Sequence, residues 1–148
     1  MKKVLKTVSI CFIVAAMLTA GAFAAAPVKP DQPQASEYIL HTSTAIVALG
    51  GGKIEIDYDI TATDEMKDVG ALQVDIYEVG TGIVWSHHYE DLGYGYLMGH
   101  NTGSYSRSVT YDKAKSKCTY YAIMKFFAGE HGVAGDIHVM DTVYVTMP

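Results

Sequence analysis

The sequence predicts an all-β domain: an antiparallel two-sheet sandwich of about seven strands. Apolar and polar residues alternate with a period of two in several segments, which is typical of strands with one buried and one solvated face. After residue 36, no segment repeats apolar residues at i, i+3, i+4 and i+7 over three turns, as an amphipathic helix would. Two packed sheets would bury the inner faces of such strands.

The clearest predicted strand spans residues 53–61. Its apolar residues are expected to face the core: Ile54, Ile56, Tyr58 and Ile60. The residues between them are polar and are expected to face solvent: Glu55, Asp57, Asp59 and Thr61. Carboxylates two positions apart on a strand are separated by roughly 6.5–7 Å. We interpret this acidic row as a solvated face that discourages edge pairing, and not as a calcium or glycosidase site.

The same alternation recurs in two later segments. In the first, the expected inward residues are Leu72, Val74 and Ile76, with Gln73, Asp75 and Tyr77 outward. In the second, Ile137, Val139, Val143 and Val145 are expected inward, and His138, Met140, Thr142 and Tyr144 outward. Four less regular strands are expected at 38–49, 83–89, 104–111 and 118–128. Glycine-containing turns are predicted at 50–52, 79–82 and 129–132. Residues 63–69 and residues 112–117 are each compatible with a single helical turn.

Residues 1–25 predict a secretory signal peptide. Three lysines precede an apolar run from Val8 to Ala20, and small residues follow it at the expected cleavage site. An uncleaved N-terminal anchor is the alternative. Residues 26–36 then predict a proline-containing linker, and residues 37–148 predict the β-sandwich domain. The mature protein is therefore expected to be secreted, with no membrane span after signal cleavage.

Charge and cysteine content restrict the partners of the mature protein. Without residues 1–25 the chain carries eight basic and sixteen acidic side chains, a net charge of −8. Such a charge opposes binding to nucleic acid or anionic lipid and favours cations. Cys118 is the one cysteine left, which excludes an internal disulfide. We expect the Cys118 side chain to be buried and to pack as a small apolar residue, and an intermolecular disulfide is the alternative.

A family resemblance rests on the segment from Lys117 to Met124. A loop leads there into a strand whose alternate residues are expected inward: Tyr120, Ala122, Met124 and Phe126. This segment is similar to the tyrosine corner, in which a tyrosine hydroxyl hydrogen-bonds to loop backbone. Residues 38–145 thus resemble fibronectin type III and other immunoglobulin-like domains of exported bacterial proteins. The resemblance implies a sandwich architecture and no catalytic residues. The paired cysteines and third-strand tryptophan of immunoglobulin domains are missing.

The predicted connection at 91–103 is the candidate binding segment. It is long for a loop in a compact domain, and long loops are commonly functional. Tyrosine gives binding loops a large contact area at a low entropic cost. The candidate binding residues are Tyr94, Tyr96, Met98 and His100. The alternative is that this loop covers an edge of the core or crosses between the sheets.

Histidines and acids near this loop offer an alternative metal site. Its candidate ligands are His87 or His88, Glu90, Asp91 and His100. Adjacent strand residues point to opposite faces, so one of the two neighbouring histidines at most would join a given site. The other interpretation is a set of exposed histidines at the rim of a hairpin. No nucleophile elbow or phosphate-binding loop is found in the sequence, and no catalytic residue, metal or cofactor is predicted.

These features favour a secreted, non-enzymatic binding or interaction module for an extracellular protein or glycan. One alternative is a small secreted metal-binding protein or enzyme that uses the region of His87, His88 and His100. Another is a secreted antagonistic, bacteriocin-like protein. The sequence does not indicate an oligomeric state.

Overall fold

The computed structural model describes residues 37–148. The predicted signal peptide and linker, residues 1–36, lie outside these described residues. The described part contains seven strands and one short 3₁₀ helix, and no α-helix. In chain order the elements are β1 (Ile39–Gly50), β2 (Lys53–Glu78), β3 (Gly82–His88), η1 (Gly95–Leu97), β4 (Met98–Tyr111), β5 (Thr119–Glu130), β6 (Ala134–Asp141) and β7 (Val145–Thr146).

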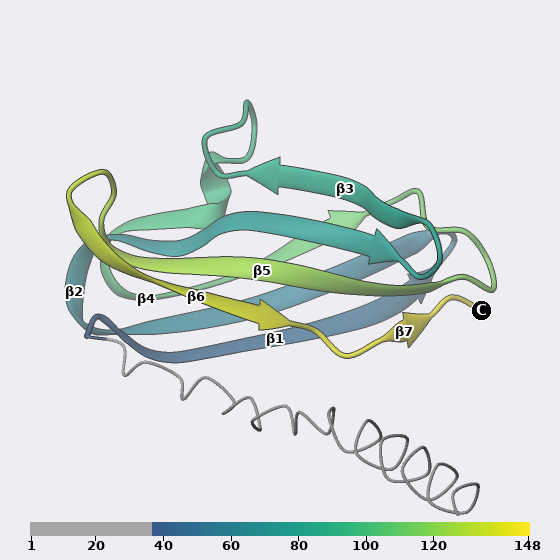
Figure 1. Ribbon diagram of the computed structural model, residues 1–148, viewed down its shortest axis with the longest axis horizontal. Helices are drawn as coiled ribbons and strands as arrows, with labels where there is room; N and C mark the ends of the chain where they lie inside the picture. Colours follow the sequence, from purple (N-terminus) through teal and green to yellow (C-terminus); the bar gives the residue numbers. More distant parts are fainter. Residues whose placement is uncertain (1–36) are drawn as a thin grey trace, which may run out of the picture. The chain divides into compact units, whose positions relative to one another are not determined.

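All seven strands form one antiparallel sheet around β2 (Figure 1). The first half of β2 pairs with β1 on one side and β4 on the other. Its second half pairs with β5 on one side and β3 on the other. β6 and β7 then pair with β5. The sheet curls so that both halves of β2 contribute to one hydrophobic core. The predicted all-β antiparallel class is therefore confirmed.

β2 joins two segments that the sequence predicted as separate strands. The expectation of a helical turn at 63–69 is wrong, because these residues remain extended. The register of β2 against β4 shifts between Thr61 and Met66, and pairing then continues to Gly70. Val69 is fully buried, so the core face resumes after the exposed polar stretch at the bend. The second proposed helical turn, at 112–117, is also not helical.

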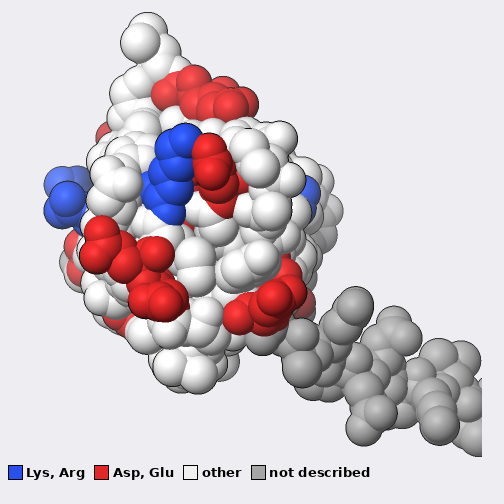
Figure 2. Space-filling view, turned by 90° about the vertical axis from the view of Figure 1, so that its left-hand side faces the viewer, with Lys and Arg blue, Asp and Glu red and all other residues white. Residues whose placement is uncertain are grey.

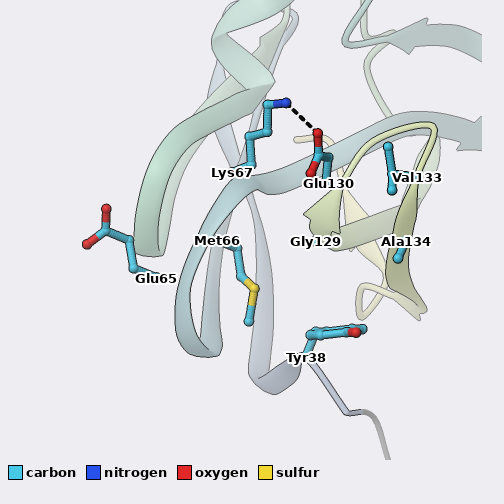
Figure 3. Close-up of a pocket in the computed structure, with 8 residues that line it drawn as sticks. All are labelled: Tyr38, Glu65, Met66, Lys67, Gly129, Glu130, Val133 and Ala134. Carbon is cyan, nitrogen blue, oxygen red and sulfur yellow. Dashed lines mark hydrogen bonds and ion pairs between the residues drawn. The ribbon is translucent and has the colours of Figure 1, made fainter.

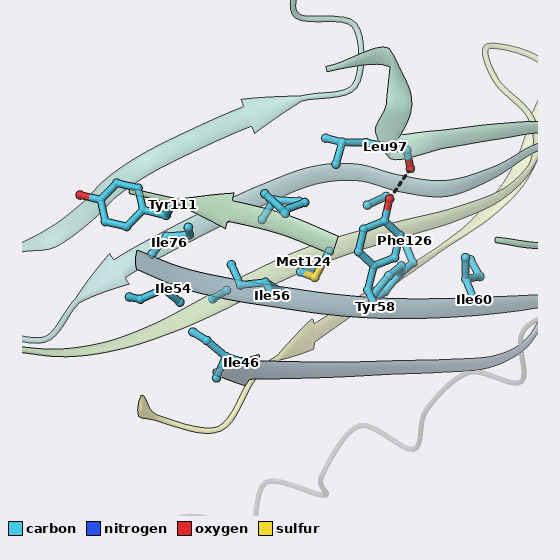
Figure 4. Packing of buried hydrophobic residues seen from close by; sticks show 14 of the residues in the cluster. Ile46, Ile54, Ile56, Tyr58, Ile60, Ile76, Leu97, Tyr111, Met124 and Phe126 are labelled. Atoms are coloured by element: carbon cyan, nitrogen blue, oxygen red, sulfur yellow. Dashed lines mark hydrogen bonds between the residues drawn. The ribbon is translucent and has the colours of Figure 1, made fainter. Parts of the chain in front are cut away.

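Most of the core comes from residues that the sequence predicted to face inward (Figure 4). Residues with no exposed surface come from both halves of the sheet: Ile54, Ile56, Ile60, Val74, Ile76, Tyr120, Ala122, Met124 and Phe126. Tyr58 lies among them with its ring centroid 5.8 Å from that of Phe126. The Tyr58 hydroxyl donates a hydrogen bond of 2.8 Å to the carbonyl of Leu97. Burial raises the pKa of Tyr58 far above its ordinary value.

The predicted inward position of Leu72 is wrong because of a β-bulge. The register between β2 and β5 shifts between Ala71 and Gln73. This shift turns Leu72 to the opposite face of the sheet, where it packs with Met98 and Phe127 in a separate small cluster. A one-residue insertion reverses the phase of a strand, which explains the error.

The alternation predicted for β6 is also reversed. Ile137 and Val139 are 62% and 51% exposed, although they were expected inward. In the register with β5, His138 lies opposite Phe126 and Met140 opposite Met124, so these two share the inner side.

After β6, the predicted inward and outward positions are reversed for two residues and correct for the next two. Thr142 is buried and Val143 is 72% exposed, the reverse of the expectation. Val145 packs against the core and Tyr144 is exposed, as predicted.

The predicted turns connect the strands as expected, and Cys118 forms no internal disulfide in the described residues. The glycine-containing turns predicted at 50–52, 79–82 and 129–132 connect β1 to β2, β2 to β3 and β5 to β6. Gly80 and Gly132 have φ angles of 85° and 80°, the left-handed region that favours glycine. Cys118 is half-buried against the core and forms no disulfide within residues 37–148.

Side chains close the gap between β1 and β6. No backbone pairing between these two strands occurs in the described chain. Thr42 Oγ1 lies 2.7 Å from His138 Nδ1 and 2.9 Å from Met140 Sδ. The backbone N–H of Tyr38 donates a 2.7 Å hydrogen bond to Asp136. The edges of β1 and β6 are therefore held together by polar side chains.

Candidate binding surface

The irregular segment after β3 is shorter than the sequence predicted. Residues 98–103 belong to β4, where Met98, His100 and Thr102 pair with Gly70, Asp68 and Met66. The expectation of one loop over 91–103 is therefore wrong. The glycines and polar residues at its end resemble a loop in sequence, but β2 supplies a backbone partner for them.

Tyr94 covers the core. Its ring stacks on that of His87 with centroids 3.7 Å apart and makes an edge contact with Trp85 at 5.6 Å. Tyr94 is half-buried and packs against the main cluster of buried residues. Tyr96 is 40% exposed, and its carbonyl accepts a 2.6 Å hydrogen bond from Tyr105. This arrangement matches the alternative in which the loop covers an edge of the core.

The other two predicted binding residues lie elsewhere. Met98 is only 3% exposed, because it packs with Leu72 and Phe127. His100 is exposed, and its Nδ1 atom lies 2.7 Å from Oδ1 of Asp68. The four predicted residues therefore do not meet in one site.

The histidines of the alternative metal site face different carboxylates. His87 Nδ1 is 3.2 Å from Asp91, and His88 Nδ1 is 3.6 Å from Glu90. Hydrogen bonds from the backbone of His88 and the side chain of His87 lower the pKa of Asp91. Within residues 37–148 no group of three or more His, Cys, Asp or Glu is arranged to hold a metal. The geometry gives the alternative metal site no support.

The acidic row of β2 lies on the side away from the core, as predicted. Ser108 of β4 donates a 2.5 Å hydrogen bond to Asp57. Ser106 donates to Asp59 in the same way. Neighbouring hydroxyl groups therefore satisfy these two carboxylates across the strand pair.

A surface that the sequence did not single out lies on the opposite side of the sheet from the core. We call it the outer face. It is formed by the second half of β2 together with β3, β5, β6 and the residues around β7. Partners in antiparallel register share a face, so the register defines its members. They include Gln73, Asp75, Tyr77, Ile83, Tyr121, Ile123, Lys125, Ile137, Val139, Asp141 and Tyr144.

An aromatic row crosses this outer face. Tyr77 and Tyr121 are register partners, and their rings stack with centroids 4.8 Å apart and planes 10° apart. Tyr144 continues the row, with its ring centroid 5.1 Å from that of Tyr121. Ile83 extends it on the other side, since it pairs with Tyr77 and is 55% exposed. Each of the two central rings covers one face of the other, and both side chains are half-buried.

A polar network lies beside the aromatic row. Gln73 Nε2 donates to both carboxylate oxygens of Asp75 at 2.9 Å, and Ser86 donates to one of them at 2.5 Å. Lys125 Nζ donates to Gln73 Oε1 at 3.0 Å. These residues are bonded to one another, so they hold the strands of the outer face in place.

One end of the outer face carries histidines and acids from four parts of the chain. Asp68 accepts a 3.0 Å hydrogen bond from the backbone of His131, in addition to its contact with His100. Burial opposes ionisation of Asp68, but these two hydrogen bonds lower its pKa overall. The Tyr89 hydroxyl lies 2.9 Å from His131 Nδ1 and donates to Glu90 at 3.2 Å. Sequence reasoning missed Asp68 and His131 because only the strand register brings them together.

A shallow pocket of about 260 Å³ lies between the bend of β2 and the β5–β6 hairpin (Figure 3). Its lining residues are Tyr38, Glu65, Met66, Lys67, Gly129, Glu130, Val133 and Ala134. Lys67 and Glu130 form an ion pair of 2.5 Å at its edge, and Glu130 raises the pKa of Lys67. Figure 2 views this end of the molecule, where acidic side chains outnumber basic ones. Residues 37–148 carry seven basic and fifteen acidic side chains.

Comparison with known proteins adds no assignment. No family model matches the chain, and no curated protein is significantly similar to it in sequence. Within residues 37–148, no helix has the length and apolar character needed to cross a membrane.

Proposed function

We propose that this protein is a secreted, non-enzymatic interaction module that binds an extracellular protein through its outer face. The observation that carries this proposal is the row formed by Ile83, Tyr77, Tyr121 and Tyr144, in which Ile83 and Tyr144 are exposed and the two middle rings are half-buried. Contiguous exposed apolar surface on a small domain is typical of an interaction site. The predicted signal peptide supports an extracellular location.

The row has the properties of a protein-binding surface. Tyrosine is enriched at the centres of protein interfaces, where its ring packs and its hydroxyl forms a hydrogen bond. Tyr77 and Tyr121 already stack on each other, so a partner would have little side-chain motion left to restrict. Val139 and Ile137 extend the apolar surface along β6.

The ring geometry favours a protein over a glycan. A sugar ring stacks on the open face of an aromatic side chain, but Tyr77 and Tyr121 each have one ring face covered by the other ring. Edges and hydroxyl groups suit side chains and backbone of a protein partner better.

An immunoglobulin-like architecture is part of the same proposal. The Tyr120 hydroxyl accepts a 2.8 Å hydrogen bond from the backbone N–H of Lys115, in the loop that precedes β5. This is the bond that the tyrosine-corner resemblance implies. The two halves of β2 pair with different strands, as two layers of a sandwich would require.

Site-specific crosslinking tests the proposal. A photoreactive p-benzoylphenylalanine replaces Tyr144 in the full chain, which is exported by its native host and irradiated in the culture. We expect a discrete crosslinked product containing one other protein. The matched control places the same group at Val47, which is 46% exposed on β1. Absence of a product at residue 144, or the same products at both positions, would contradict the proposal.

A further inference from the structure

We infer that the partner of the outer face is a basic protein segment and not a second copy of this chain. This inference rests on the proposed function and names the chemistry of the partner. It is carried by the charges that accompany the aromatic row.

The outer face is acidic. Its acidic members are Asp68, Glu90 and Asp141, whereas Asp75 is only 7% exposed and is hydrogen-bonded to Gln73 and Ser86. Its basic member is Lys125, which is already hydrogen-bonded to Gln73. Three carboxylates and one ammonium group leave a formal net charge of −2 on this surface, with histidines counted as neutral.

Charge and apolar surface are interleaved on this face. Asp141 pairs with Ile123 in the register of β5 and β6, one step along from Tyr121. Val139, which is 51% exposed, lies two residues before Asp141 on the same side of β6. A segment that alternates apolar side chains with lysine or arginine would therefore meet complementary groups along the face.

A second copy of the chain is disfavoured by the same charges. Two outer faces brought together would each carry −2, on domains that each carry −8. Like charges across an interface oppose association and suppress the wrong partner. The negative charge of this surface attracts only a partner that is positively charged.

Histidine rings lie beside two of these carboxylates, Asp68 and Glu90. His100 faces Asp68, while His88 and His131 lie 3.6 Å and 3.9 Å from Glu90. The remaining neighbours are polar or acidic. Tyr89 contacts the His131 ring, Gln73 lies opposite His88, and Asp91 accepts the His88 backbone N–H.

A pair of synthetic peptides tests the charge preference on the full mature protein. One alternates lysine with leucine and tyrosine, and the other has glutamate in place of each lysine. Fluorescence anisotropy at physiological ionic strength measures the affinity of the protein for each peptide. We expect binding of the basic peptide only, and about a tenfold weaker affinity for the double variant Glu90→Gln/Asp141→Asn. The matched control is Asp57→Asn/Asp59→Asn, which changes the net charge equally on the first half of β2.

Each outcome decides the inference. Equal weakening in the control variant would show unspecific attraction to the whole domain and would overturn it. Binding of the acidic peptide, or a dimer in sedimentation that Tyr144→Ser dissolves, would overturn it as well. If crosslinking at residue 144 captures a protein through a segment without basic residues, this inference fails while the proposed function stands. If no protein is captured, both fail.

Discussion

The hydroxyl of Tyr120 donates a 2.8 Å hydrogen bond to the carboxylate of Glu78, 42 residues earlier in the chain. The same hydroxyl accepts the backbone N–H of Lys115. One buried oxygen therefore connects the start of β5, the end of β2 and the loop between β4 and β5. Burial of the phenol, the largest contribution, raises the pKa of Tyr120 to about 12.

Replacement of Tyr120 by phenylalanine should destabilise the fold. The change removes one hydroxyl, so the backbone N–H of Lys115 loses its partner and Glu78 loses one of its three side-chain donors. We expect the free energy of unfolding to fall by about 1–3 kcal/mol, measured by urea denaturation. Tyr121→Phe, at the next position on the outer face, is the control and should change stability by less than about 0.5 kcal/mol. Equal effects of both variants would contradict the role assigned to Tyr120.

Glu78 should make stability dependent on pH in the acid range. Hydrogen bonds from Thr81, Tyr120 and Lys115 lower its pKa below the ordinary value of 4.5. A carboxylate with a lowered folded-state pKa contributes stability above its unfolded pKa, and this is lost as pH falls through the folded value. Urea denaturation between about pH 5 and pH 3 should therefore show a steeper loss in the wild type than in Glu78→Gln. The same pH dependence of stability in the wild type and in Glu78→Gln would contradict this role of Glu78.

Truncation of the inward row of β2 should have a large effect. Ile56 has no exposed surface, and Ile56→Ala should lower the free energy of unfolding by about 2–5 kcal/mol. Val47 of β1 is 46% exposed, so Val47→Ala should cost less than about 0.5 kcal/mol. Thermal and chemical denaturation of both variants measures the difference. Similar losses at the two positions would refute the burial pattern.

Tyr94 and Tyr96 should differ in their contribution to stability. Tyr94 stacks on His87 and packs against the core, so Tyr94→Ala should lower the free energy of unfolding by at least about 1 kcal/mol. Tyr96 has a more exposed ring, and its bond to Tyr105 uses the backbone carbonyl, which alanine retains. Tyr96→Ala should therefore be nearly neutral in the same measurement. A neutral Tyr94→Ala would restore the view of Tyr94 as a free binding residue.

Gly70 should not tolerate a side chain. A Cβ atom built at this position would lie 2.3 Å from the carbonyl oxygen of Leu97 and 2.8 Å from Cα of Met98. Both atoms belong to backbone, which cannot rotate away as a side chain would. Gly70→Ala should therefore lower the melting temperature, whereas Gly95→Ala, which has open space around it, should not. An unchanged melting temperature for Gly70→Ala would show that β4 can shift away from β2.

The sequence predicted the strands well where a single period of two ran unbroken. The row from Ile54 to Ile60 and the row from Tyr120 to Phe126 both face the core as expected. The errors at Leu72 and along β6 share one cause. A bulge after Ala71 and the register of β6 against β5 each depend on a partner strand, which periodicity within one segment does not reveal.

The candidate surface was harder to predict than the fold. Tyr77, Tyr121 and Tyr144 are spread over three separate segments of the chain, and only strand pairing places them side by side. Tyr94 lies between two glycines in the sequence, a context that is typical of a binding loop and is equally compatible with packing against the core. Tyr144 was expected outward, but nothing in the linear sequence linked it to Tyr121.

The unbroken course of β2 through the bend at 62–66 has a consequence for folding. Its residues serve as the middle strand for β1 and β4 and then for β3 and β5. Both portions of the molecule take their central strand from the one continuous β2, so a fragment ending near residue 62 would leave β3 and β5 without a template. The domain should melt and refold as one cooperative unit, and a protease cut at the bend should abolish both portions together.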